Sequence, residues 1–269
     1  INRKTVVHFN EYKKEKEKQG VLGANHSLIE KLMALEADSA ENKSTFVELS
    51  AAREKFMKAL RDRRANPGTR ITCGIPEIDD TMNVGFKPGH LTLFCADIGS
   101  FKTTMMVNVA VNIHKLHGLN VLYIPLEMPA DEIITKIVGR ELQLDMHKIE
   151  HSDQLTDDEV DRVDAEFLKW ENKGSSFAIL DMAERTKVST IRREIEKRIS
   201  YFKPDIVVVD YVDNLIPDIS RAGRNDLELN DMLEDLRKMG KVLGFSVISA
   251  AQLARDALKK VQDQQPGKQ

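Results

Sequence analysis

Five short apolar runs, each rich in β-branched residues, alternate along the chain with stretches of helical periodicity, and this alternation restricts the fold more than any other feature. The runs cover residues 91–95, 121–126, 177–180, 205–210 and 245–249. Because each run is apolar almost throughout, rather than at every second residue, we expect strands that are buried on both faces. Such strands separated by helices predict an α/β fold with a mostly parallel sheet covered by helices on both faces.

Helix signals fill the intervals between these runs. Helices are expected from Lys102 to His117, from about Ala130 toward Leu142, and from a capping box of Thr156 and Glu159 to about Trp170. A further apolar stripe stops before Pro204 and consists of Ile191, Ile195, Ile199 and Phe202. The chain therefore reads as repeated strand and helix units.

Composition excludes several protein classes. Of 269 residues, 41% are apolar and 31% are charged, and the net charge is −3. This is ordinary globular composition, which excludes disordered, collagen-like and mucin-like chains, and the total charge requires no polyanionic partner. No apolar run approaches the roughly 20 residues of a membrane-spanning helix, so we expect no membrane partner. The chain starts with Ile rather than Met, which indicates a fragment or a processed form without a visible targeting segment.

Cysteine usage bears on the compartment. Cys73 and Cys95 are too few for a disulfide framework, and we interpret both as small core residues of an intracellular protein.

The amino-terminal part differs in charge from the rest. Residues 1–70 carry 15 basic and 10 acidic side chains, whereas the remainder carries 25 and 33. A capping box of Thr45 and Glu48 predicts a helix that ends at 66–68. Its apolar stripe contains Phe46, Leu49, Phe56, Met57 and Leu60. Such a stripe has to be buried, either on the same subunit's core or on a neighbouring subunit, and the sequence leaves both open.

The first strand runs into a loop with the composition of a phosphate-binding loop. Strand, loop and helix follow one another there, so that backbone amides at the helix start face the ligand. The candidate binding residues are Asp97, Ile98, Gly99, Ser100, Phe101, Lys102, Thr103 and Thr104. Lys102 would supply a cation to the phosphates and the Thr103 hydroxyl would hold magnesium, with Thr104 as the less favoured substitute.

The loop departs from the template Gly-x-x-x-x-Gly-Lys-Ser/Thr at both glycines. Ala96 stands at the first and Phe101 at the second. A side chain resists the backbone angles that the second glycine can adopt. Either Phe101 is strained, or the loop has another shape in which Gly99 supplies the freedom. Taken alone, the segment fits a nucleotide site and an ordinary strand-to-helix turn equally well.

Polar residues follow three other predicted strands. Asp210 ends the fourth run and suits a magnesium carboxylate, with Asp213 as the fallback if the register slips. Glu127 follows the second run and could accept a proton from an attacking water, although an acid before Pro129 also suits a helix start. Gln252 follows the fifth run and could sense a γ-phosphate by hydrogen bonding. Each signal is weak alone, but parallel strands bring them to one edge, which favours a nucleotide site.

These motifs resemble the DnaB-type replicative helicases, including those of T-even and related phages, over about residues 70–260. The resemblance is carried by the segment Thr72 to Asp80, by Leu-Glu-Met-Pro-Ala at 126–130, by Gln-Leu-Thr at 154–156, by Val-Asp-Tyr at 209–211 and by Ala-Gln-Leu at 251–253. It implies a RecA-like P-loop core with Lys102 and Thr103 in the phosphate loop. It also implies that Glu127 is the catalytic base, Asp210 the magnesium carboxylate and Gln252 the γ-phosphate sensor.

The same resemblance implies an activity and partners. Members form homohexameric rings that move 5′ to 3′ along single-stranded DNA while hydrolysing ATP with Mg²⁺, and they work with a primase and a helicase loader. The compartment would be the cytoplasm of a bacterial or phage-infected cell. Loop residues proposed by position to contact DNA phosphates, although surface solvation explains them equally well, are Arg221, Arg224, Arg255, Lys259 and Lys260.

The implied domain division places a helical linker or subunit-docking segment at 1–70 and a RecA-like ATPase domain at 71–269. That domain would be truncated at its carboxyl end, before the arginine finger that a neighbour supplies. Two other functions stay open. One is a RecA-like ATPase that is not a helicase, such as a recombinase, loader or clock-type regulator, and the other is a non-enzymatic scaffold with a degenerate phosphate loop.

Overall fold

The computed structural model describes residues 48–65, 70–97, 99–171, 174–182, 185–220 and 225–252. The chain divides into two compact units with a boundary after Asn66. In the first unit, the described part is helix α2 (Leu49–Ala65). It confirms a helix where the apolar stripe predicts one, while the Thr45 half of the predicted capping box lies outside the described residues.

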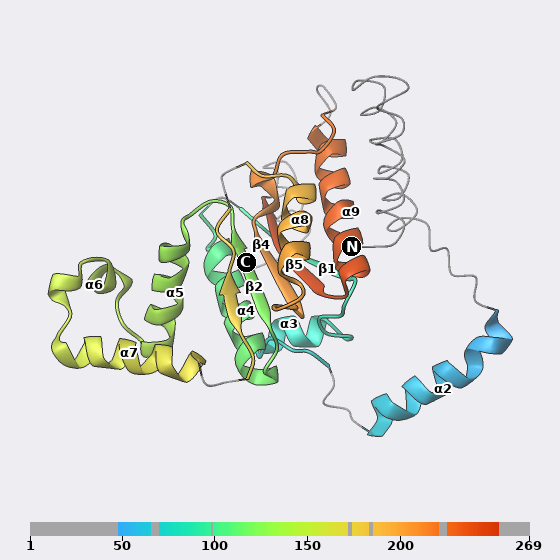
Figure 1. Cartoon of the computed structure of the whole chain (residues 1–269), viewed down its shortest axis with the longest axis horizontal. Coiled ribbons are helices and arrows are strands. Elements are labelled where there is room, and N and C mark those ends of the chain that lie inside the picture. The colour runs from blue at the N-terminus through green and yellow to red at the C-terminus, as the bar shows by residue number, and fades with distance from the viewer. Residues whose placement is uncertain are drawn as a thin grey trace, which may run out of the picture. The chain divides into compact units, whose positions relative to one another are not determined.

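The second unit contains a five-stranded sheet in which all neighbouring strands are parallel (Figure 1). The strands are β1 (Leu91–Ala96), β2 (Val121–Pro125), β3 (Phe177–Ile179), β4 (Ile206–Asp210) and β5 (Ser246–Gln252), in the spatial order β1-β5-β4-β2-β3. Each predicted run contains one strand, so the predicted fold class is confirmed. The largest difference is at β5, which continues to Gln252 rather than ending at 249.

Seven α-helices of the second unit lie in the described residues. They are α3 (Pro76–Thr81), α4 (Lys102–His117), α5 (Ala130–Leu142), α6 (Met146–Glu150), α7 (Asp157–Glu171), α8 (Val188–Arg198) and α9 (Asn225–Leu243). Two short 3-10 helices cover Ser152–Gln154 and Val212–Asn214. The sequence-based expectations did not include α9, whose apolar positions recur at helical spacing and include Met232, Leu236 and Met239.

Helices cover both faces of the sheet, and each face has its own core. On one face, α4 and α5 pack against Val121, Tyr123 and Val208. On the other face, α8 and α9 pack against Leu122 and Val207. Successive residues of a strand point to opposite faces, and both faces are covered, so the strands are apolar at every position. This two-sided burial explains the continuous apolar runs in the sequence.

The two cysteines occupy different environments. Cys73 is buried, as predicted, and packs in the core beneath α4. Cys95 is exposed on β1, so its assignment to the core is wrong. The reason is its place one residue before the end of the strand, where the sheet approaches its open edge.

Among the described residues, no helix combines the length and the apolar character that crossing a membrane requires.

Candidate functional site

Four strands deliver the predicted site residues to one edge of the sheet. In the strand register, Ala96 of β1 lies opposite Gln252 of β5, and Pro125 of β2 lies opposite Asp210 of β4. All four positions are the last residues of their strands. Because the strands are parallel, their carboxyl ends meet at one edge, where open α/β sheets bind ligands.

The loop after β1 takes left-handed backbone angles at two positions. Gly99 has a φ of +70° and open space around the position of a Cβ atom. Phe101, immediately before α4, has φ 56° and ψ 34°. A side chain in this conformation costs about 1–2 kcal/mol. Both alternatives left open by the sequence therefore hold together: Gly99 supplies freedom, and Phe101 adopts the strained angles with 79% of its surface exposed.

Lys102 is the first residue of α4, and its side chain folds back over the loop. Its Nζ donates a hydrogen bond to the carbonyl oxygen of Asp97 at 2.9 Å. The same Nζ lies 5.3 Å from the centre of the Tyr211 ring, within reach of a cation–π attraction. The lysine cation thus lies in the concavity of the loop, held by one neutral acceptor that an anion could replace.

Asp210 is buried at the end of β4, with 1% of its surface exposed. Its Oδ1 accepts a hydrogen bond from the Thr103 hydroxyl at 3.2 Å, and its Oδ2 accepts one from the Tyr123 hydroxyl at 2.6 Å. Burial raises the pKa of Asp210 to about 6; the nearby Glu127 charge adds to this, while the two hydrogen bonds and Lys102 oppose it. The site therefore holds a carboxylate that has lost most of its hydration.

Tyr123 was not predicted as a site residue. It is fully buried on β2, and its burial together with Asp210 raises its own pKa well above the ordinary value. The available signal was a single hydroxyl in an otherwise apolar buried strand, because a buried tyrosine hydroxyl requires a hydrogen-bond partner.

Glu127 lies just beyond β2 on the same edge. The backbone amide of Leu126 donates to the carbonyl oxygen of Asp210 at 2.8 Å, which ties this segment to the end of β4. The Glu127 side chain is exposed, and within the described parts of the chain its carboxylate has no hydrogen-bond or ion-pair partner. Its effect on the pKa of Asp210 places the two carboxylates within electrostatic range of each other.

Gln252 ends β5, and its backbone amide donates to Oδ2 of Asp213 at 3.0 Å. The register therefore decides between the two aspartates: Asp210 contacts Thr103, while Asp213 is engaged by the end of β5. Thr104 is exposed at the start of α4 and has no contact with Asp210 in the described structure. Ile98 and the basic residues Arg221, Arg224, Arg255, Lys259 and Lys260 lie outside the described residues.

The oxygen atoms of Thr103 and Asp210 suit a magnesium ion. Mg²⁺ takes oxygen ligands and is held in proteins by few carboxylates together with water and substrate phosphates. A hydroxyl and a carboxylate 3.2 Å apart, next to a lysine and a loop of free amides, fit that pattern. Across the described residues, no cluster of three or more His, Cys, Asp or Glu side chains offers an all-protein metal site.

Comparison with known proteins agrees with this geometry. Residues 70–268 match the family described as "DnaB-like helicase C terminal domain". The chain belongs to this family. The resemblance seen in the sequence is therefore confirmed, and the loop after β1, the Glu127 segment and the end of β4 are parts of a DnaB-like domain.

Curated relatives are replicative helicases at low identity. The replicative DNA helicase DnaB of Geobacillus stearothermophilus is 25% identical over 199 residues, which are 74% of this chain and 42% of that protein. A probable plasmid replicative DNA helicase of Chlamydia trachomatis is 22% identical over 232 residues, or 84% of this chain and 49% of that protein. The chain thus spans about half the length of the DnaB-like relatives it matches.

Solved structures share the fold. A structure described as an isolated ATPase domain superposes with a TM-score of 0.68 at 22% identity, covering 81% of this chain and 76% of that one. A DnaB-like replicative helicase, described with its interactions with primase, gives a TM-score of 0.63 at 20% identity over 98% of this chain and 59% of that one. These similarities confirm the RecA-like ATPase fold of this DnaB-like domain.

Proposed function

We propose that this chain is the motor of an ATP-dependent replicative helicase that forms a ring and moves 5′ to 3′ along single-stranded DNA, coupling ATP hydrolysis to strand separation. The observation that carries the proposal is the convergence of Lys102, Asp210, Glu127 and Gln252, which are far apart in sequence, on one edge of the sheet. Membership of the DnaB-like family supports it.

The phosphate loop would bind the ATP phosphates. Residues 97–104 surround the start of α4, where free backbone amides and the helix dipole favour negative charge. Lys102 would exchange the Asp97 carbonyl for a phosphate oxygen. Thr103 and Asp210 would hold Mg²⁺, which, when bound, neutralises charge that develops on the phosphates.

Glu127 and Gln252 would act on the attacking water and the γ-phosphate. The Glu127 carboxylate is exposed and free of competing partners among the described residues, so it can accept a proton from water. Gln252 is held at the neighbouring strand end by Asp213 through its backbone, which leaves its side-chain amide to report on the γ-phosphate.

DNA would be bound mainly through its phosphates. The proposed contacts are Arg221, Arg224, Arg255, Lys259 and Lys260, from the loops that follow β4 and β5 in the sequence. We further propose a primase and a loader as partners and the bacterial or phage-infected cytoplasm as the compartment. A primase interaction is described for a structural relative.

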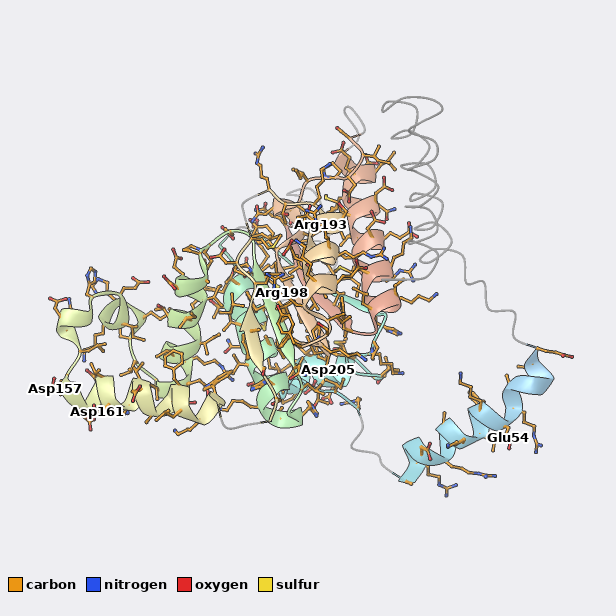
Figure 2. The ribbon with its side chains drawn as sticks, in the orientation of Figure 1. Glu54, Asp157, Asp161, Arg193, Arg198 and Asp205 are labelled. Carbon is orange, nitrogen blue, oxygen red and sulfur yellow. The ribbon has the colours of Figure 1, made fainter. Side chains whose placement is uncertain are left out.

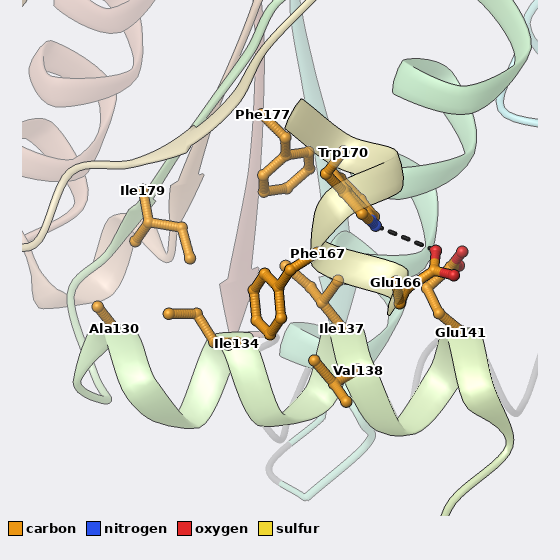
Figure 3. A pocket seen from close by; sticks show the side chains of 10 residues that line it. All are labelled: Ala130, Ile134, Ile137, Val138, Glu141, Glu166, Phe167, Trp170, Phe177 and Ile179. Carbon is orange, nitrogen blue, oxygen red and sulfur yellow. Dashed lines mark hydrogen bonds between the residues drawn. The ribbon is translucent and has the colours of Figure 1, made fainter. Parts of the chain in front are cut away.

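Ring formation would bury two apolar surfaces that are exposed in the described chain. On α2, Leu49, Phe56 and Leu60 are exposed at a spacing that places them on one helix face. In the second unit, α5, α7 and β3 surround an apolar groove of about 380 Å³, into which Phe167, Trp170 and Phe177 point (Figure 3).

Charge matches these two surfaces. The α2 sequence contains six basic and two acidic residues, whereas α7 contains seven acidic and two basic residues. Asp157 and Asp161 project from the outer side of α7 (Figure 2). We propose that α2 of one copy docks on the α5–α7 groove of the next copy, which answers the question left open by the sequence in favour of a neighbouring subunit.

ATP hydrolysis and unwinding by the full chain test this proposal. Lys102→Ala and Glu127→Gln should each lower single-stranded-DNA-stimulated ATP hydrolysis by at least about a hundredfold, as expected for loss of a phosphate cation or a general base. Lys203→Ala, at an exposed lysine before the amino end of β4, is the control. Unchanged hydrolysis in both site variants would contradict the motor assignment, and hydrolysis without unwinding of a forked duplex would favour a RecA-like ATPase that is not a helicase.

One observation favours a second candidate function, a scaffold without ATPase activity. Phe101 occupies the position where the template has glycine, in left-handed backbone geometry. Calorimetry with a non-hydrolysable ATP analogue separates the two functions, because a scaffold would bind none of it with or without Mg²⁺.

A further inference from the structure

Tyr123 carries the one polar side chain of β2, and it is directed at the site rather than at solvent. The strand reads Val-Leu-Tyr-Ile-Pro and is buried at every position. The Tyr123 side chain is fully buried, and its hydroxyl donates to Oδ2 of Asp210 at 2.6 Å. A phenol in such a strand needs a partner, and the partner here is the carboxylate at the end of the neighbouring strand.

The strand register explains why this contact forms. Tyr123 lies opposite Val208, and Asp210 is two residues further along β4 on the same face. Diagonal neighbours of this kind are about 7–8 Å apart, a distance that only long side chains cover. The Tyr123 ring also stacks against Phe177 of β3, with ring centres 6.5 Å apart at 22°. The ring is therefore fixed along the sheet face with its hydroxyl toward the carboxyl edge.

The two oxygens of the Asp210 carboxylate have different partners. Oδ2 faces Tyr123 inside the core, and Oδ1 faces the Thr103 hydroxyl at the start of α4. We propose that Tyr123 is a positioning residue: it holds Oδ2, fixes the rotation of the carboxylate, and thereby presents Oδ1 to Thr103 and to a magnesium-bound nucleotide. This inference rests on the proposed nucleotide site and deepens it.

A core-filling role for Tyr123 predicts something different. A tyrosine that only fills space would affect the free energy of unfolding and would leave the contribution of Mg²⁺ to nucleotide binding unchanged. A positioning residue would change the Mg²⁺-dependent part of nucleotide affinity, because it acts through the oxygen that faces the metal site. The Mg²⁺ dependence therefore separates the two roles.

Calorimetry on the full chain provides the test. The affinity for a non-hydrolysable ATP analogue is measured with Mg²⁺ and with EDTA, and the ratio of the two is the quantity compared. Tyr123→Phe keeps the ring and removes the hydroxyl, and it should lower this ratio about tenfold, as expected for a lost hydrogen bond to a charged group. The affinity in EDTA should stay within about twofold, because the phosphate loop is unaltered.

Two further variants complete the experiment. Tyr123→Met also lacks the hydroxyl and fills the same core with a flexible side chain, so it should show the same loss if Tyr123→Phe does not fold. Tyr201→Phe, which removes a hydroxyl from an exposed tyrosine, should leave the ratio unchanged. Circular dichroism confirms that each variant is folded at the assay temperature.

The possible outcomes separate the role of Tyr123 from the function on which it rests. An Mg²⁺-dependent ratio that is present in the wild type and retained in full by folded Tyr123→Phe and Tyr123→Met would overturn the role of Tyr123 alone. A wild-type protein that gains no affinity from Mg²⁺ would overturn the proposed metal site, and the role of Tyr123 with it.

Discussion

Replacing Asp210 with asparagine should make the protein more stable at alkaline pH while removing its Mg²⁺-dependent nucleotide binding. The carboxylate is 1% exposed, and its pKa rises from 3.8 to about 6 on folding, mainly through burial. A difference of this size corresponds to about 3 kcal/mol by which the ionised carboxylate destabilises the folded state. Asparagine has nearly the same shape and carries no charge.

The sign follows from the direction of the pKa change. Because the folded pKa is raised, the full destabilisation is present above pH 6 and disappears as the pH falls from about 6 to 3.8. Asparagine cannot serve both Thr103 and Tyr123 as well as a carboxylate does, which costs about 1 kcal/mol. The net expected gain at pH 8 is therefore about 2 kcal/mol, or roughly 4–8 °C in Tm for a domain of this size.

Urea unfolding without nucleotide or metal measures this effect. The difference in unfolding free energy between Asp210→Asn and wild type should be positive at pH 8 and should shrink steadily toward pH 4. Asp164→Asn, at an exposed site on α7, should give a difference near zero throughout. An Asp210→Asn protein that is less stable than wild type at pH 8, or a difference that does not vary with pH, would refute the account of Asp210 as a costly buried carboxylate.

Three other changes test separate parts of the structure. Phe101→Gly should raise affinity for an ATP analogue by calorimetry, because it releases about 1–2 kcal/mol of left-handed strain and removes a mostly exposed ring; weaker binding would show that the ring contributes to the site. Phe56→Glu, which places an acid on the apolar face of α2, should reduce the population of rings in native mass spectrometry, while Glu54→Gln on the opposite face should not; intact rings in both would contradict docking on α7. Thr156→Ala should lower the free energy of unfolding by about 1 kcal/mol in urea titrations, because the reciprocal hydrogen bonds of Thr156 and Glu159 cap α7; no change would mean that water replaces the cap.

Local chemistry was sufficient to predict much of this protein. The five apolar runs become the five strands, because burial on both faces leaves no place for a polar residue inside them. The loop before α4, the carboxylate that ends β4 and the capping box of Thr156 were all readable from residue type and spacing. The spacing also identified the apolar face of α2, although not the surface that it covers.

Tertiary structure decided what spacing cannot express. The choice of Asp210 over Asp213 depends on strand register, since a shift along β4 would exchange their positions. The contact between Tyr123 and Asp210 needs β2 and β4 to be neighbours, although 87 residues separate them. A sequence records which side chains can bond, but only the packed sheet determines which of them meet, because pairing order and register arise from contacts that are distant along the chain.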